Sequence, residues 1–427
     1  MTVDTRKRLG KSPLVLIEIV RDARVLFISG LIALNMLSIN CAAATPSIDE
    51  MWQVIQQQQA EIKMLKSRLV ETESKTEATA EAIDLVAEST ASGGSLLGGN
   101  TVIGGYGEMH YNNLENQADG SDKSAMDFHR FVLFFGHQFT DSVRFFSELE
   151  VEHSIAGDGK VGEVELEQAF IEWDYSPEQK LTAGLFLLPV GILNETHEPE
   201  TFYGVERNNV EKNIVPATWW EGGASLSGEI TQGWSYNVAV TTGLFLKGGK
   251  YKVRDGRQKV GKANAEDLAY TGRIKYTGSA GLELGLTFQY QSDLLQSMTV
   301  SGADDVDATL IEAHAAYQSG PFMFRALYAT WDIDDDINLI KAGADEQTGW
   351  YLEPSYRFSP EWGVFARYER WDNTAGAGTN SEMTQFDIGF NYWLTERVAI
   401  KMDYQDQDAP NGSKEEDGFN LGIGWSF

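Results

Sequence analysis

From Asn100 onward, the hydrophobic pattern of the chain repeats with a period of two residues. The clearest example covers residues 282–290, where Leu, Phe and Tyr alternate with polar or small residues. Such alternation is typical of β-strands with one apolar and one polar face. Sixteen segments of this kind follow one another, and they start near residues 101, 126, 143, 163, 180, 219, 234, 268, 281, 308, 322, 347, 362, 382, 398 and 418.

The connections between these segments are alternately short and long. Residues 139–142 and 176–179 form short turns, for example, whereas the connections 112–125 and 188–218 are long. A soluble β-sandwich has no reason to collect its long loops at one end, but an outer-membrane barrel does, because its periplasmic turns are short. An even strand count also means that the chain enters and leaves the barrel on the same side, the periplasmic one. We therefore predict an all-β transmembrane barrel of about 16 antiparallel strands over residues 100–427.

Lipid supplies the physical reason for a closed sheet. Backbone N–H and C=O groups cannot remain unpaired in hydrocarbon, so a sheet that crosses it must close, with strands of about 9–11 residues. Tryptophan placement agrees, because such barrels carry an aromatic girdle at each interface. We expect a periplasmic girdle of Trp173, Trp234, Trp362, Trp393 and Trp425, and an outer girdle of Trp331, Trp350 and Trp371.

The last ten residues, GFNLGIGWSF, alternate without interruption. The apolar positions are expected to face lipid and the small or polar ones the lumen, and the strand should close against the first strand near Tyr106. A terminal aromatic residue such as Phe427 also resembles the assembly signal read by the outer-membrane barrel assembly machinery. We therefore expect that machinery to be a partner of the chain.

Two segments with other patterns precede the barrel. Arg21 and Arg24 stand before an apolar stretch at 25–37, and Cys41-Ala42-Ala43-Ala44 follows it. This order is typical of a secretory signal with an A-x-A cleavage site, which predicts a signal peptide over residues 1–44. The alternative is a lipoprotein modified at Cys41, and Asn40 disfavours it because the residue before such a cysteine is usually small.

Residues 45–92 repeat with a period of seven. Eight of the twelve a and d positions between Ile48 and Val86 are apolar, and the opposite face is polar. The repeat favours an α-helical coiled coil over a lone amphipathic helix. A coiled coil placed before a barrel of even strand number must lie in the periplasm. The Gly and Ser residues at 93–99 break the helix and form a hinge.

The charge balance excludes some partners. The chain has 34 Lys and Arg residues against 63 Asp and Glu residues, a formal net charge of −29. Such an acidic chain disfavours nucleic acid as a partner. Its single cysteine, Cys41, excludes an intrachain disulfide framework.

One stretch of the barrel resembles a known family. Residues 184–228 contain Leu188-Pro189-Val190-Gly191, Ile214-Val215-Pro216 and Trp220-Glu221-Gly222-Gly223-Ala224, and this text resembles the phosphate-selective porin family of bacterial outer-membrane channels. A looser likeness lies at residues 269–273. The resemblance implies a sixteen-stranded homotrimeric channel for small hydrophilic solutes, whose third long loop folds into the lumen. Some members also carry a periplasmic coiled coil before the barrel, so the resemblance makes residues 45–92 a trimeric one.

The long loop at 188–218 is accordingly expected to narrow the pore, where rings of charge decide what passes. The alternative is an exposed surface loop. The charged residues of the loop are Glu195, Glu198, Glu200, Glu206, Arg207, Glu211 and Lys212. Their excess of acids departs from a phosphate-selective pattern, so anion and cation preference both stay open.

Two further groups of basic residues are candidates for solute or lipid contact. Strand alternation places the first on or near the lumen face, beside acids: Arg130, Arg144, Arg273, Lys275, Arg357, Arg367 and Lys401. The second lies in the next outer loop: Lys247, Lys250, Lys252, Arg254, Arg257, Lys259 and Lys262. The second group would draw anions inward or bind lipopolysaccharide phosphates. The alternative is a solvated loop that balances acidic neighbours.

Catalytic and metal motifs are not evident. The six histidines lack metal-ligand spacing, and the chain has no nucleophile elbow or phosphate-binding loop, so we expect no enzyme, metal or cofactor. A lipid-facing phospholipase site would need a Ser–His pair, for which His137 is a poor candidate. The sequence favours a passive diffusion channel for small hydrophilic solutes or ions, anions such as phosphate included. The alternative is a structural anchor tethered to the periplasm through the coiled coil.

Overall fold

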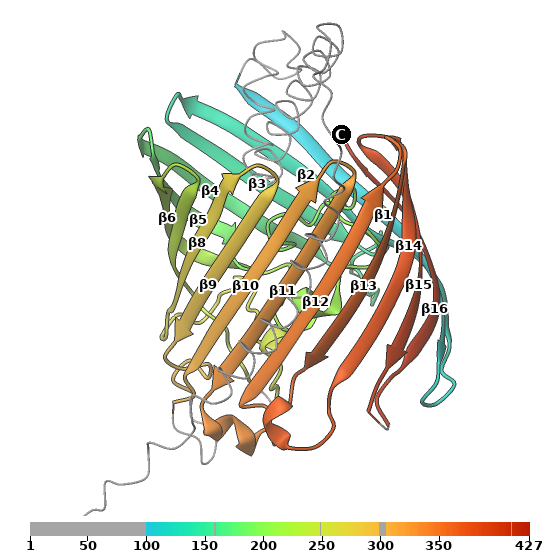
Figure 1. The fold of residues 1–427 in the computed structure, drawn as a ribbon. Coiled ribbons are helices and arrows are strands. Elements are labelled where there is room, and N and C mark those ends of the chain that lie inside the picture. Colours follow the sequence, from blue (N-terminus) through green and yellow to red (C-terminus); the bar gives the residue numbers. More distant parts are fainter. Residues whose placement is uncertain (1–99, 158, 248, 299–304, 411) are drawn as a thin grey trace, which may run out of the picture. The chain divides into compact units, whose positions relative to one another are not determined.

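The computed structural model describes residues 100–427 except 158, 248, 299–304 and 411. The signal peptide, coiled coil and hinge predicted for residues 1–99 lie outside the described residues. The described part forms a closed barrel of sixteen antiparallel strands (Figure 1). None of its helices is long and apolar enough to cross a membrane.

The strands follow the order of the chain around the barrel. Their bounds are β1 (Thr101–Asn116), β2 (Lys123–Thr140), β3 (Val143–Glu152), β4 (Val164–Ser176), β5 (Gln179–Leu187), β6 (Trp220–Thr231), β7 (Trp234–Thr241), β8 (Ala269–Ser279), β9 (Leu282–Gln291), β10 (Ala308–Ser319), β11 (Phe322–Ile333), β12 (Glu346–Arg357), β13 (Trp362–Asp372), β14 (Met383–Thr395), β15 (Val398–Asp408) and β16 (Glu416–Ser426). The barrel predicted from the alternating pattern is thus confirmed, and no predicted start differs from the observed one by more than three residues.

Closure joins the first strand to the last. Tyr106 pairs with Ser426, at the position expected from the sequence. Beyond this pair, the amide of Gly105 donates to the carbonyl of Phe427 (3.0 Å), and the amide of Phe427 donates to the carbonyl of Gly105 (2.9 Å). The sheet therefore has no open edge, as lipid requires.

The outer face of the barrel is apolar and the inner face is polar. On β9, Leu284, Leu286 and Phe288 are exposed on the outside, whereas the alternating residues Thr287 and Gln289 are buried on the inside. Other strands repeat this arrangement with exposed Val, Ile, Tyr and Phe side chains. A continuous apolar outer surface is what a membrane-spanning barrel needs.

The tryptophan prediction is only partly right. Trp173, Trp234 and Trp362 are exposed near the short turns, as expected for the periplasmic girdle. Trp331, Trp371 and Trp393 are instead buried, with 7% exposure or less. Their strand positions point inward, where Trp331 and Trp371 join an apolar cluster and Trp393 packs on Tyr203. Nearness to a strand end was a sound criterion for depth, but it does not decide which face a side chain takes.

Two long loops fill part of the barrel interior. We call residues 188–219 L3 and residues 242–268 L4. L3 contains the short helix α4 (Asn209–Asn213), and L4 contains the 3-10 turn η1 (Val253–Gly256); η2 (Asp335–Leu339) and η3 (Ala375–Ala377) lie in later loops. Buried apolar side chains of L3 and L4 pack on the inner faces of β10 to β13. The loops contribute Leu188, Val190, Ile214, Trp219, Leu244 and Leu246, and the strands contribute Leu310, Leu327, Trp331, Tyr351 and Trp371.

Glycines of β16 make room for L3. A Cβ on Gly424 would lie 2.4 Å from Cβ of Pro199, and one on Gly422 would lie 3.0 Å from a methyl carbon of Val205. Both distances are shorter than ordinary van der Waals contact. The small residues that alternate with apolar ones in the last strand therefore face the lumen, and they let the loop approach the wall.

We predict that deleting Phe427 lowers the amount of assembled barrel more than it lowers the conductance of barrels that do assemble. The deletion removes two backbone hydrogen bonds at the closure and the contact of the Phe427 ring with Phe131, whose centroids are 6.2 Å apart. The amount of folded barrel in outer-membrane fractions measures the effect. Phe427→Tyr, which keeps the backbone and the ring, is the matched control. Unchanged barrel levels after the deletion would contradict the prediction.

Candidate pore constriction

L3 lies inside the barrel and is held there by the walls. Arg130 of β2 donates to the carbonyl of His197 (2.6 Å), and Arg325 of β11 donates to the carbonyl of Thr201 (3.0 Å). On the opposite side of the loop, the amide of Val205 donates to Asp403 of β15 (2.6 Å). The expectation that this loop enters the lumen is met by these contacts, since an exposed surface loop could not reach β2, β11 and β15 together.

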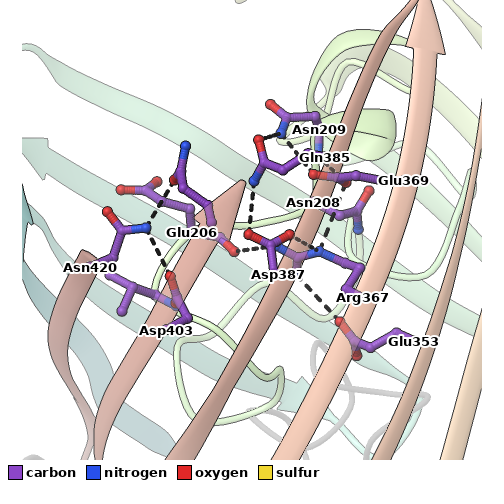
Figure 2. Close-up of polar contacts among 12 residues, drawn as sticks. Glu206, Asn208, Asn209, Glu353, Arg367, Glu369, Gln385, Asp387, Asp403 and Asn420 are labelled. Atoms are coloured by element: carbon purple, nitrogen blue, oxygen red, sulfur yellow. Dashed lines mark hydrogen bonds and ion pairs between the residues drawn. The ribbon is translucent and has the colours of Figure 1, made fainter. Parts of the chain in front are cut away.

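A network of polar side chains supports the helix end of L3 (Figure 2). Glu369 of β13 accepts hydrogen bonds from the backbone amide (2.7 Å) and the side-chain amide (2.8 Å) of Asn209. Next to it, Arg367 is 3.0 Å from Asp387 and 3.3 Å from Glu353. Figure 2 also shows Asn420 donating to Asp403 (2.8 Å), which orients the carboxylate that accepts from Val205.

Glu211 holds the interior of L3 together. Its carboxylate is fully buried and accepts from the amides of Ile192 (2.9 Å) and Leu193 (2.6 Å) and from the hydroxyl of Tyr351 (2.9 Å). Burial raises the pKa of Glu211 above its usual value, and the donors from Leu193, Tyr351 and Asn208 oppose this rise. Glu211, which was predicted to face the pore, therefore stabilises the fold of L3 instead.

The other predicted acids of L3 also point to the wall or into the loop. Glu195 forms an ion pair with Arg273. Glu206 is 3.1 Å from Nδ1 of His110 and accepts from the side chain of Asn112 (3.2 Å). Glu198 and Glu200 each place one carboxylate oxygen in a buried position. Three of the five acids of this loop, Glu195, Glu206 and Glu211, are thus engaged in holding the loop in place.

Three arginines from L3 and L4 gather at one point. Arg254 donates to the carbonyls of Lys212 and Ala217 (both 2.8 Å), and Arg257 donates to the carbonyl of Thr218. Arg207 donates to the hydroxyl of Thr218 (2.7 Å). The predicted outer-loop residues Arg254 and Arg257 therefore join Arg207 of L3 in the barrel interior.

The positive charges of this arginine triad, Arg207, Arg254 and Arg257, act on one another. Burial, followed by Arg257 and Arg207, lowers the pKa of Arg254 to about 9, so the group stays cationic at neutral pH. Burial and Arg207 likewise lower the pKa of Arg257, while Glu167, Glu165 and Glu152 raise it. Those glutamates belong to the β3–β4 side of the lumen, which places acids opposite the arginine triad.

Some of the acids that face the triad are already paired with a lysine. Lys259 of L4 pairs with Glu163 (3.1 Å) and with Glu165. In contrast, none of the carboxylates in the described part of the chain lies within 4.0 Å of the three guanidinium groups. Backbone carbonyls and a hydroxyl hold these groups instead, so their charge is not cancelled by a direct ion pair.

The remaining basic residues divide between the walls and the loop surface. Three of the predicted lumen residues are paired with acids of the wall: Arg130 with Glu108 (2.6 Å), Arg144 with Glu172 (2.5 Å) and Asp174 (2.6 Å), and Lys275 with Glu283 (3.8 Å). Arg273 pairs with Glu195 of L3. Lys401 lies 3.6 Å from the centre of the Phe202 ring, and Arg357 lies 4.2 Å from that of Trp393. In L4, Lys247, Lys250 and Lys262 are exposed and Lys252 is half-buried.

Three groups of possible metal ligands, which spacing along the sequence did not indicate, come together among the described residues. Asp127, His129 and His153 form the first, Glu148, Glu167 and His197 the second, and Glu150, Glu152 and Glu165 the third. In the first group, Nδ1 of His153 is 2.8 Å from Asp127, and His129 is 3.4 Å from it. The members of each group come from more than one strand or loop, so spacing along the chain could not indicate them.

Comparisons with known proteins agree with this geometry. Residues 207–412 match the family model described as Gram-negative porin. An uncharacterized protein of Aquifex aeolicus (strain VF5) is 32% identical over 361 residues, which covers 76% of this chain and 79% of that protein. The chain belongs to the Gram-negative porin family. Family and fold together indicate a passive channel in the bacterial outer membrane and not an enzyme.

Solved structures share the barrel of this porin at low sequence identity. The outer membrane channel DcaP of Acinetobacter baumannii has a TM-score of 0.55 at 13% identity, covering 77% of this chain and 97% of that one. The anion-selective porin from Comamonas acidovorans has a TM-score of 0.56 at 13% identity, with 77% and 99% covered. Salmonella typhi OmpF, in complex with daunomycin, also has a TM-score of 0.56 at 13% identity, with 77% and 98% covered. The finer resemblance to phosphate-selective members stays a prediction.

We predict that Glu211→Ala lowers the free energy of unfolding by about 3 kcal/mol, because it leaves buried amide donors in L3 without an acceptor. Urea titration followed by tryptophan fluorescence measures the change. Lys212→Ala is the matched control, since the neighbouring Lys212 side chain is exposed and its loss should cost less than about 0.5 kcal/mol. Equal stability of the two variants would contradict a structural role for Glu211.

Proposed function

We propose that this porin is a passive diffusion channel for small hydrophilic solutes that favours small anions, phosphate among them, over cations. The observation that carries the proposal is the arginine triad of Arg207, Arg254 and Arg257 in the barrel interior. No bond is made or broken during passage. Solutes cross down their gradient, and pore width and local charge set the preference.

Local charge outweighs net charge in such a pore. The chain as a whole carries −29, but exposed charges more than about 10 Å from a permeating ion are largely screened at moderate salt. The triad acts at close range and has no direct ion pair, while Glu195, Glu206 and Glu211 of L3 are engaged with Arg273, His110 and backbone amides. An anion entering this region therefore meets positive charge that no direct ion pair cancels.

A structural neighbour is compatible with this preference. The Comamonas acidovorans porin of similar fold is described as anion-selective. The likeness extends only to the barrel, so the proposal rests on the arginine triad of this chain. Exposed Lys247, Lys250 and Lys262 at the outer end of L4 would add a weaker attraction, either for anions approaching the pore or for lipopolysaccharide phosphates.

We predict that neutralising the triad shifts the pore toward cations. Each of Arg207→Gln, Arg254→Gln and Arg257→Gln removes about 1 kcal/mol of attraction, or about fivefold in the anion-to-cation permeability ratio. The reversal potential of planar bilayers in a potassium chloride gradient measures this ratio. Lys262→Gln is the matched control, because its side chain is exposed in the same loop. A triad variant with the reversal potential of the control would contradict the proposed anion preference.

The second candidate function is a structural anchor in the outer membrane. L3 contacts walls as far apart as β2, β11 and β15, and its apolar side fills the lumen beside β10 to β13, so the loop strongly narrows the barrel. A barrel closed by its own loop would serve to attach a periplasmic segment and not to conduct. The same bilayers decide between the two: purified trimers that show no conductance would favour the anchor.

We also propose that residues 45–92 form a periplasmic coiled coil that joins three copies of the chain, following a signal peptide at 1–44. The heptad pattern supports it, and Vibrio cholerae OmpT, a neighbour at TM-score 0.52 and 10% identity, is described in a trimer form.

Deleting residues 45–92 is expected to leave a folded barrel with fewer heat-resistant trimers, because all sixteen strands lie after residue 100. Electrophoresis of unheated and stepwise heated samples reports both folding and assembly, with the full-length chain as the control. Trimers of unchanged heat resistance would contradict a role of the coiled coil in assembly.

A further inference from the structure

The strongest unassigned feature is the meeting point of L3 with β3 and β4. His197 of L3, Glu148 of β3 and Glu167 of β4 converge there, and each side chain is 3% exposed or less. Nε2 of His197 lies 3.5 Å from Oε1 of Glu148 and 3.6 Å from Oε2 of Glu167. One ring nitrogen therefore faces two carboxylates in a buried position.

These distances are long for hydrogen bonds but suitable for ligands of one ion. Zinc binds histidine nitrogen and carboxylate oxygen at about 2.1 Å, and tetrahedral angles then separate the ligand atoms by about 3.4 Å. Nε2 of His197 and Oε2 of Glu167 also have no hydrogen-bond partner among the described residues. Buried polar atoms without partners are costly, so two of them facing each other point to a bound species between them.

The surrounding contacts prepare these groups as ligands. Nδ1 of His197 is 3.1 Å from the carbonyl of Asn194, and because a carbonyl only accepts, Nδ1 carries the proton toward it. Nε2 is then directed at the two carboxylates. Gln168 donates to Oε2 of Glu148 (2.7 Å), and Tyr106 donates to Oε1 (3.1 Å). Such second contacts are common for metal-binding histidines and carboxylates, where they fix orientation.

The charges of Glu148 and Glu167 also favour a bound cation. Glu148 and Glu167 are both buried, and in the described part of the chain neither has a lysine or arginine within 4.0 Å. The nearby Arg130 is engaged by Glu108 at 2.6 Å. Two buried carboxylates without such a partner carry more negative charge than a single histidine proton can offset, whereas a divalent cation matches it.

We propose that Glu148, Glu167 and His197 bind a divalent first-row transition-metal ion, represented by Zn²⁺, which fastens L3 to the β3–β4 wall. The other two ligand groups are less suitable. In the first, His153 and Asp127 already approach to 2.8 Å, a hydrogen-bond distance. In the third, Glu165 is already paired with Lys259. The site shares Glu167 with the acids that act on Arg257 of the arginine triad, but it needs no solute to pass. Its role is to fix the position of the constriction loop.

Zinc content of the purified full-length protein tests the proposal. The protein is treated with a chelator, loaded with Zn²⁺, desalted and measured by inductively coupled plasma mass spectrometry, alongside His197→Gln and Glu167→Gln. His314→Gln is the matched control, since His314 is also a buried histidine between two glutamates, but Glu312 and Glu283 contact opposite ring nitrogens (2.7 and 3.4 Å). Heat-modified gel migration confirms that each variant is folded.

The expected result is one equivalent of zinc per chain in the wild type and in His314→Gln, and almost none in the other two variants. Zinc should also raise the unfolding temperature of the wild type and not that of His197→Gln, because a ligand of the folded state stabilises it. Substitution with Co²⁺ should give the strong visible absorption of a tetrahedral site, lost in Glu167→Gln.

Two outcomes overturn the proposal. A wild type that retains no more zinc than His197→Gln has no such site. Zinc that persists in a folded His197→Gln is held elsewhere, with Asp127, His129 and His153 as the first place to look. Both outcomes are read from metal content, so failure of this proposal is distinguishable from failure of the channel proposal, which the bilayer recordings test.

Discussion

The need to pair every backbone group in lipid determines the rest of this molecule. Closure of β16 on β1 through Tyr106 and Ser426 satisfies it, with Gly105 and Phe427 extending the pairing by two hydrogen bonds. In an antiparallel closed sheet of sixteen strands, the start of β1 and the end of β16 then lie at the same rim of the barrel as the short turns. All long loops therefore lie at the extracellular end of the barrel, and from there a loop such as L3 can fold into the lumen.

A soluble protein has an apolar core and a polar surface. A membrane barrel of this size has the reverse, because lipid covers its apolar outside and its interior is polar. This chain builds a second, apolar interior inside the first, from L3, L4 and the inner faces of β10 to β13. Glycines at 422 and 424 permit L3 to approach the opposite wall. The loop is thus held by packing on one side and by side-chain hydrogen bonds on the other, which defines where its charged residues stand.

Alternation along the sequence was enough to predict the strands, their lumen faces and the closure near Tyr106, because a period of two is a local property. The outer girdle position expected for Trp331 rested instead on nearness to a strand end, which indicates depth in the membrane and not which face of the sheet the side chain takes. Alternation could not predict that Arg254 and Arg257 meet Arg207, or that His197 meets Glu148 and Glu167. Those groups are assembled by two loops folding against distant walls, and no spacing in the chain records that folding.

The position of L3 connects the acids of this porin to its selectivity. Glu195, Glu206 and Glu211 would oppose anions if they faced the pore, but they bind Arg273, His110 and backbone amides and so hold the loop. Because its acids are used in this way, the loop presents Arg207 without a direct counter-charge, and L4 adds Arg254 and Arg257 by bonding to the backbone of L3. In the channel that we propose, an acidic chain thus offers a basic constriction. In that channel, any contact that shifts L3, even one far from the arginines, changes the charge that a passing solute meets.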